Sequence, residues 1–153
     1  MSATGLDVFD KTLQTTNSWL DEIMAAIGPD RQLAWKVLSI VLHVLRDRLS
    51  VDAAAHLSAQ LPLLVRGVYY DQYQPWRQPS DCATIEAFTA EVAKWLRDVR
   101  PVDPKTATRA VFGLLLHRLD PGQVAKIQNV LPASIRDFWQ AIEVEWDLAL
   151  ANG

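Results

Sequence analysis

The side chains best suited to catalysis or metal binding are three histidines and one cysteine. They are His43, His56, His117 and Cys82. Neither His-Glu-x-x-His nor Glu-x-x-His occurs, although these are the helical spacings that gather the ligands of zinc and di-iron sites. The cysteine has no partner at Cys-x-x-Cys spacing. The sequence therefore predicts no catalytic residue, no metal and no cofactor, and it leaves enzymatic activity open while favouring a protein without it.

Two of these residues each allow more than one interpretation. His43 lies in the most apolar stretch of the chain, Val37 to Leu45, where a buried histidine with a local hydrogen bond is the usual finding. The alternative is an enzyme with a non-obvious site around His43 or His117. Cys82 follows Asp81, whose negative charge disfavours the reactive thiolate, so we expect an unreactive thiol.

Four aromatic residues stand within eight positions of one another in the middle of the chain. They are Tyr69, Tyr70, Tyr73 and Trp76. Aromatic side chains that carry a polar atom are favoured at protein interfaces. One interpretation is that these residues pack between two parts of the chain, with each polar tip hydrogen-bonded. The other is that they form a surface for a protein partner or for self-association, and they are the candidate partner-binding residues.

The composition limits the possible classes of protein. Half of the residues are hydrophobic, 22% are charged and the net charge is -3, which is typical of a folded domain. Without a basic excess we expect neither nucleic-acid nor membrane binding. The longest apolar run, Val37 to Leu45, is far shorter than the roughly 20 residues of a membrane span. A single cysteine and an N-terminus without a secretory signal fit a soluble, cytoplasmic protein.

Apolar residues recur at helical spacing along the whole chain. Ser50, Asp103 and Asp120 are candidate N-caps, and Pro62 and Pro132 suit the first position of a helix. No stretch shows the alternation that is typical of a strand. The pattern predicts an all-α protein with about eight helices at residues 7–27, 31–48, 51–60, 62–71, 82–98, 104–118, 121–131 and 132–150.

The second half of the chain repeats part of the first at a spacing of 70 residues. Residues 41–69 and 111–139 share eight identities, where about two are expected by chance. We expect two related four-helix halves, 7–71 and 82–150, joined by a linker at 72–81. Because each half is below about 80 residues, they should share one core within a single unit, 1–153. The residues assigned to this structural repeat are Arg48, Leu61, Pro62, Arg66, Arg118, Leu131, Pro132 and Arg136.

The region around the Leu-Pro pair resembles a known family. Its elements are Arg48-Leu49, the segment VDAAAHLSAQLP, Arg66-Gly67, Tyr69-Tyr70-Asp71 and Pro75. The chain is similar in these to domain-of-unknown-function family 2267, which consists of small bacterial and archaeal proteins. Gln72 stands where that family usually has glycine, and Tyr73 where it usually has tryptophan. The resemblance implies an all-helical fold and brings no activity with it.

These observations favour a non-enzymatic interaction or structural module. The alternative is a small-molecule-binding regulator with a pocket between the halves, lined by Trp35, Trp95 or the tyrosines. A concave pocket with convergent polar groups would favour the alternative. The repeated arginines are expected to serve the fold by binding helix C-terminal carbonyls or carboxylates.

Overall fold

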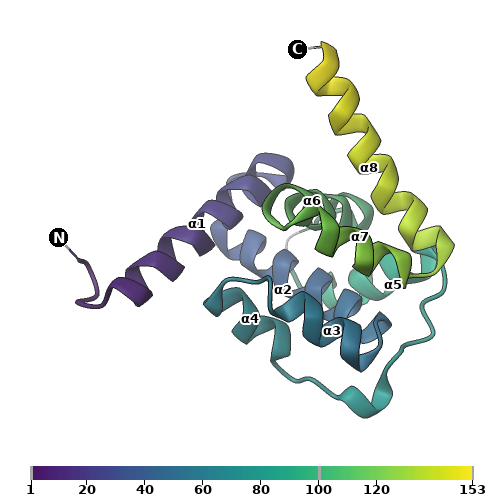
Figure 1. Ribbon diagram of the computed structural model, residues 1–153, viewed down its shortest axis with the longest axis horizontal. Helices are drawn as coiled ribbons and strands as arrows, with labels where there is room; N and C mark the ends of the chain where they lie inside the picture. Colours follow the sequence, from purple (N-terminus) through teal and green to yellow (C-terminus); the bar gives the residue numbers. More distant parts are fainter. Residues whose placement is uncertain (1, 100, 153) are drawn as a thin grey trace.

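The computed structural model describes residues 2–99 and 101–152, and every regular element in these ranges is helical (Figure 1). Eight α-helices and one 3-10 turn follow one another, and no β-strand is present in the described residues. The predicted all-α class with about eight helices is confirmed. The elements are α1 (Asp7–Ile27), α2 (Arg31–Arg48), α3 (Val51–Ser58), α4 (Leu63–Tyr70), η1 (Pro75–Arg77), α5 (Ile85–Leu96), α6 (Pro104–Arg118), α7 (Pro121–Asn129) and α8 (Ala133–Asn152).

Capping side chains set the beginnings of several helices at the predicted places. The side-chain oxygens of Ser50, Asp103 and Asp120 each accept a hydrogen bond from the backbone N–H three residues further on. These bonds satisfy donors that have no partner within the helix. The observed bounds of α1, α2 and α6 are the predicted ones.

Several helix boundaries differ from the prediction. α3, α5 and α7 each end two residues earlier than predicted, α4 ends one residue earlier and α8 two residues later. The fifth helix begins at Ile85 rather than at residue 82, because Thr84 is its N-cap and accepts a hydrogen bond of 3.1 Å from the N–H of Ala87. α4 and α8 each begin one residue after the proline that the sequence predicts as their first residue. Pro62 is extended, with ψ of 155°, and occupies the N-cap position.

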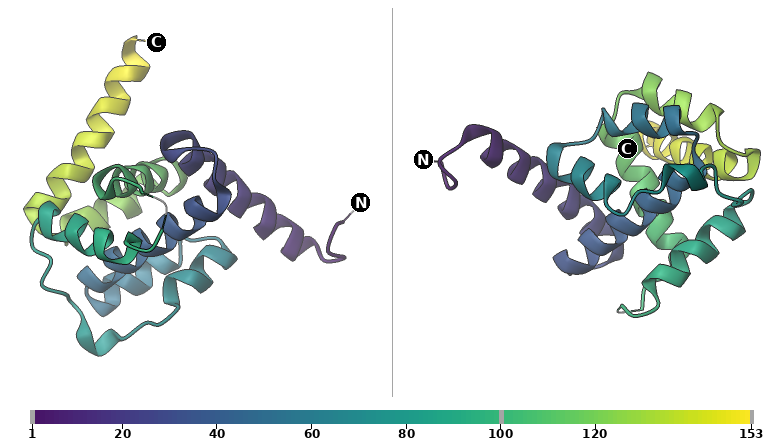
Figure 2. Two further views of the ribbon diagram at one scale, coloured as in Figure 1. Left: turned by 180° about the vertical axis from the view of Figure 1, so that it is seen from behind. Right: turned by 90° about the horizontal axis from the view of Figure 1, so that it is seen from below.

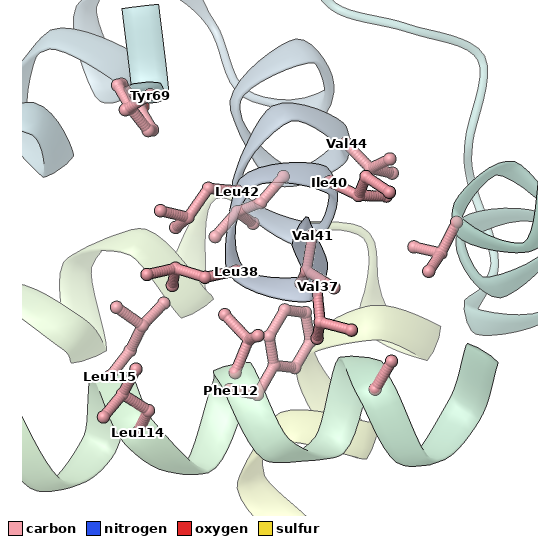
Figure 3. Close-up of a cluster of buried hydrophobic side chains, with 14 of the residues drawn as sticks. Val37, Leu38, Ile40, Val41, Leu42, Val44, Tyr69, Phe112, Leu114 and Leu115 are labelled. Atoms are coloured by element: carbon pink, nitrogen blue, oxygen red, sulfur yellow. The ribbon is translucent and has the colours of Figure 1, made fainter. Parts of the chain in front are cut away.

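Helices α2 and α6 lie at the centre of the structure. α2 is buried on nearly every side, as its continuous apolar run predicts. Figure 3 shows its side chains meeting those of α6, with Val37 and Val41 near Phe112 and Leu38 near Leu115. Every other helix adds buried hydrophobic side chains to the same cluster. The position of α2 therefore fixes where the remaining helices pack.

Two buried aromatic residues join helices through their polar tips. Tyr69 of α4 donates its hydroxyl to the backbone oxygen of Ala54 in α3 at 2.7 Å. Trp139 of α8 donates its indole N–H to the backbone oxygen of Phe112 in α6 at 3.1 Å and stacks on that ring at 4.4 Å. Tyr69 and Trp139 are 70 residues apart, the spacing of the expected repeat. Tyr69, however, bonds the third helix of the first half, whereas Trp139 bonds the second helix of the second half. The internal repeat stays a prediction.

The first and last helices extend beyond the bundle. Figures 1 and 2 show the first turns of α1 and the C-terminal part of α8 projecting away from the other helices. α8 packs on α6 with Trp146 over Gly113. The two helices are so close there that a Cβ atom added to Gly113 would lie 3.0 Å from the indole carbon Cζ2. None of the helices in the described part of the chain is long and apolar enough to cross a membrane.

We expect Tyr69→Phe to lower the free energy of unfolding by about 1–2 kcal/mol, because it removes a donor from a fully buried carbonyl. Tyr70→Phe is the matched control, since its hydroxyl bonds Ser58 Oγ at a half-buried position. Its cost should be smaller. Urea unfolding followed by circular dichroism measures both, and an equal loss in the two variants would contradict the assignment.

Candidate functional site

The connection between α4 and α5, residues 71–82, is an ordered strap held against the end of α2. Its main anchor is Arg46, whose side chain is buried. One terminal nitrogen, Nη1, donates to the backbone oxygens of Tyr69 at 2.7 Å and Asp71 at 3.0 Å. Nε donates to Asp47 Oδ1 at 2.8 Å. A buried guanidinium requires such partners, so the strap and α2 are fixed together by one charged group.

A second set of bonds makes the strap a C-terminal cap for α2. The side-chain nitrogen of Gln78 donates to the backbone oxygens of Arg46 at 2.6 Å and Leu49 at 2.9 Å. The N–H of Ser80 donates to the backbone oxygen of Asp47 at 2.7 Å. The Tyr73 hydroxyl donates to Gln78 Oε1 and orients that amide. Carbonyls that the last turn of α2 leaves without a helical partner are satisfied in this way.

The strap begins with a tight turn at Gln72. This residue has φ of 57°, in the left-handed region that favours glycine. It is also the position where the family that the sequence resembles usually has glycine. The chain thus keeps the tight turn with glutamine in its place, although a side chain makes this backbone conformation unfavourable.

A cleft of about 1080 Å³ lies between α2, α5 and the strap. Trp35 and Trp95 line this cleft, and both are residues that the sequence suggested for a pocket between the halves. Tyr69, Tyr70 and Tyr73 do not line it. Arg48 Nε, at the end of α2, donates to the backbone oxygen of Cys82 at 2.8 Å, just before α5 begins. The end of α2 and the beginning of α5 therefore meet at the strap, whereas Trp35 lies near the beginning of α2 and Trp95 near the end of α5.

His43 faces this cleft from α2 but is already engaged in the fold. Its Nε2 lies 2.6 Å from the backbone oxygen of Val68 and donates to it. Burial lowers the pKa of His43 below its ordinary value near 6.5, and the charge of Arg46 acts in the same direction. The ring is therefore neutral at pH 7 and makes the local hydrogen bond that the sequence predicts.

His117 lies apart from His43, on α6. Its Nδ1 is 2.7 Å from Glu22 Oε1, which also accepts a hydrogen bond from Arg118 Nε at 3.0 Å. His117 is largely exposed. Each histidine that the enzyme alternative considered is thus bonded to a group of the protein itself, His43 to a backbone oxygen and His117 to a carboxylate.

The four candidate partner-binding aromatics do not form one surface. Tyr69 is fully buried, so it is removed from the candidates. Tyr70 and Tyr73 are half-buried, their ring centroids are 5.5 Å apart, and their hydroxyls are bonded to Ser58 and Gln78. Trp76, on η1, is 77% exposed and is the one member whose ring is open to solvent. The group mainly packs the strap against the bundle.

The repeated arginines have different partners in the two halves. Arg66 donates to the backbone oxygens of Ser58 and Leu61 at the end of α3, as expected of a helix-capping side chain. The backbone N–H of Arg136 donates to the backbone oxygen of Pro132 at 3.0 Å, but its side chain makes no hydrogen bond or ion pair with any described residue. Arg118 pairs with a carboxylate, whereas Arg48 bonds the strap. Leu61 and Leu131 are both buried, and Pro62 and Pro132 directly precede α4 and α8.

Sequence reasoning missed Arg46. It stands four residues after Leu42 and three before Leu49, on the buried side of α2. An arginine on the apolar stripe of a central helix indicates a paired, buried guanidinium. The place of Arg46 among buried residues of α2, and not the internal repeat, was the feature of the sequence that could have identified it.

A second notable feature is an apolar surface formed by α1 and α4. We call Phe9, Leu13, Leu63 and Leu64 the α1–α4 surface; each is between 41% and 52% exposed. The N–H of Leu64 donates to Thr12 Oγ1 at 3.4 Å, which places the first turn of α4 beside α1. Phe9 and Leu13 continue the stripe that is buried at Leu20 and Ile23 further along α1. The stripe predicted from the sequence therefore extends past the core.

A comparison with protein families finds one match. The family model described as "Uncharacterized conserved protein (DUF2267)" covers residues 16–138. No curated protein matches the chain. The strap and the cleft lie within the matched residues, whereas Phe9, Leu13 and most of α8 lie outside them.

The strained turn gives one prediction. Gln72→Gly should raise the free energy of unfolding by about 0.5 kcal/mol. Glycine removes the strain of a side chain at positive φ, which is about 1 kcal/mol, and this gain exceeds the cost of the greater flexibility of glycine in the unfolded chain. Gln72→Val should lower it, since a β-branched residue is least compatible with positive φ. Chemical denaturation compares the two. If Gly and Val had the same effect, the turn would not be contributing to stability.

A further prediction concerns pH. Because the folded protein disfavours protonation of His43, the unfolded chain binds a proton below about pH 6.5 that the folded chain resists. The stability that this difference provides is present above that pH and is lost as pH falls. His43→Gln keeps a donor for the Val68 oxygen but cannot titrate. Between pH 7.5 and pH 5.5 the urea midpoint should therefore fall more for the wild type than for His43→Gln. Equal decreases in the two proteins would contradict this prediction.

Proposed function

The chain belongs to the DUF2267 family, which brings no activity with it, and we propose that it is a non-enzymatic interaction module that self-associates through the α1–α4 surface. The observation that carries the proposal is the continuation of the apolar stripe of α1 beyond the core. Phe9 and Leu13 are 49% and 42% exposed although they lie on the buried side of their helix. Leu63 and Leu64 extend this side onto α4.

The total surface supports an interface of ordinary size. The protein exposes 8681 Å². A compact monomer of 17.2 kDa should expose about 7,800 Å². The difference is roughly 900 Å², and a standard interface removes about 800 Å² from each partner. The excess of the whole chain over a compact monomer is thus about the area that one partner of a standard interface covers.

The lack of charge along the stripe favours a second copy of the chain as the partner. The first turns of α1 carry Asp7, Asp10 and Lys11, and no other charge lies before Asp21. Lys11 lies about 200° around the helix from Phe9, on the side opposite the stripe, so two stripes that meet bring no like charges together. A two-fold axis pairs the same patch on both copies, so both apolar stripes are covered together.

The test is the mass in solution. At about 100 µM, well above a micromolar dissociation constant, we expect wild type to sediment as a dimer of twice 17.2 kDa. Phe9→Ser/Leu13→Ser should weaken association roughly a hundred-fold or more, because four half-exposed apolar side chains leave the interface, at about 1 kcal/mol each.

The matched control is Val144→Ser/Leu148→Ser on α8, where the replaced side chains are 56% and 58% exposed. This variant should remain dimeric, and circular dichroism should show unchanged helix content in both variants. A monomeric wild type, or dissociation by the α8 variant alone, would overturn the proposal.

A further inference from the structure

The second half of α8 carries an exposed apolar seam. Val144 and Leu148 are 56% and 58% exposed, and the small residues Ala141 and Ala151, which are also exposed, continue the same line. We call these four residues the α8 seam. Their alternate spacing of three and four residues is that of the apolar positions of a helix that pairs with another helix. We propose that the α8 seam binds a basic amphipathic helix of another protein.

The opposite side of α8 packs on the bundle. Trp139 and Ile142 are buried there, and Trp146 lies over Gly113 of α6. At 3.6 residues per turn, Val144 lies about 200° around the helix from Ile142, so it points away from this contact. Figures 1 and 2 show that the C-terminal part of α8 continues beyond the other helices. The fold therefore uses one side of α8 and leaves the seam exposed.

The charge of this part of the chain indicates the chemistry of the partner. Residues 137–152 contain no lysine or arginine, and their four carboxylates are those of Asp137, Glu143, Glu145 and Asp147. The whole chain has 18 acidic and 15 basic residues, so residues 1–136 carry 14 and 15. The net charge of -3 is thus +1 up to Arg136 and -4 after it. All of the excess negative charge lies on the helix that carries the seam.

Two of these carboxylates flank the seam. Glu145 follows Val144 and Asp147 precedes Leu148, so the two acids stand on opposite edges of the seam at about 100° from these apolar neighbours. Glu145 is also paired with Arg109 of α6, whereas Asp147 makes no ion pair with any described residue. Charges at such flanking positions pair with opposite charges of a partner helix and decide which partner binds. A helix with lysine or arginine beside its apolar stripe is therefore the complement.

The same charges disfavour the other occupants of an exposed seam. A second α8 helix would place acidic flanks against acidic flanks, with no lysine or arginine after Arg136 to offset them. The phosphates of a nucleic acid or of an anionic membrane would be repelled in the same way. The α8 seam shares no residue with the α1–α4 surface, so this inference does not depend on self-association through that surface.

Two synthetic peptides that differ only in charge test the inference. Each has about three heptads with leucine at both apolar positions, and the flanking positions are lysine in one peptide and glutamate in the other. Like charges on the flanks keep each peptide from pairing with itself. Fluorescence anisotropy of the labelled peptide, titrated with the full chain, should give a dissociation constant on the order of 10–100 µM for the lysine peptide. The glutamate peptide should bind at least about ten-fold more weakly.

Leu148→Ser and Leu150→Ser form a matched pair of variants. Leu150 is the more exposed of the two leucines, at 80%, but it lies about 200° around the helix from Leu148 and outside the seam. Leu148→Ser should weaken binding of the lysine peptide about five- to ten-fold, whereas Leu150→Ser should leave it unchanged. Asp147→Asn should weaken it about two- to three-fold, and added salt should reduce that difference. Circular dichroism should show unchanged helix content in all three variants.

Four results would overturn the inference. Equal binding of the two peptides would show that the seam does not select charge. Equal losses from Leu148→Ser and Leu150→Ser would show that the peptide does not bind on the seam. No binding of the lysine peptide at about 1 mM protein would remove the seam as a helix-binding surface. Dissociation of a wild-type dimer by Leu148→Ser would make a second copy of the chain the occupant.

Discussion

The buried guanidinium of Arg46 is the interaction on which the arrangement of the first half of the chain depends. It fixes the end of α2, the last turn of α4 and the start of the strap with one charged group. A buried arginine is costly unless all of its partners are in place, so this contact is strongly geometric. The strap held by Arg46 and Gln78 forms one wall of the cleft. The shape of the cleft is thus a consequence of how the core accommodates a charge.

The central position of α2 explains why the cleft lies where it does. One side of this helix meets α6 in the core, and another meets α5 beside the cleft. Ser39 and His43 interrupt the apolar run on the cleft side, and both are satisfied by backbone oxygens. The polar atoms in the most apolar helix therefore serve local structure.

Much of the fold was predictable because it rests on local signals. Apolar spacing and the caps at Ser50, Asp103 and Asp120 set the helices, and the bounds of three were predicted to the residue. The partners of Arg46 were not predictable, since its acceptors are backbone oxygens 23 and 25 residues away. For Trp35 and Trp95, the sequence suggested a shared pocket but not the strap that closes it. The exposure of Phe9 was hidden because periodicity does not show where a core ends.

The two surfaces differ in how far they are organised before binding. The cleft is bounded by helices and by a strap whose backbone and side chains are hydrogen-bonded to α2, so a ligand there has little protein to order. The first turns of α1 project from the bundle, and the segment before them, residues 2–6, is held by the bonds that Ser2 and Thr4 make to Asp10. Association through α1 must therefore bury enough apolar area to offset the ordering of this projecting helix.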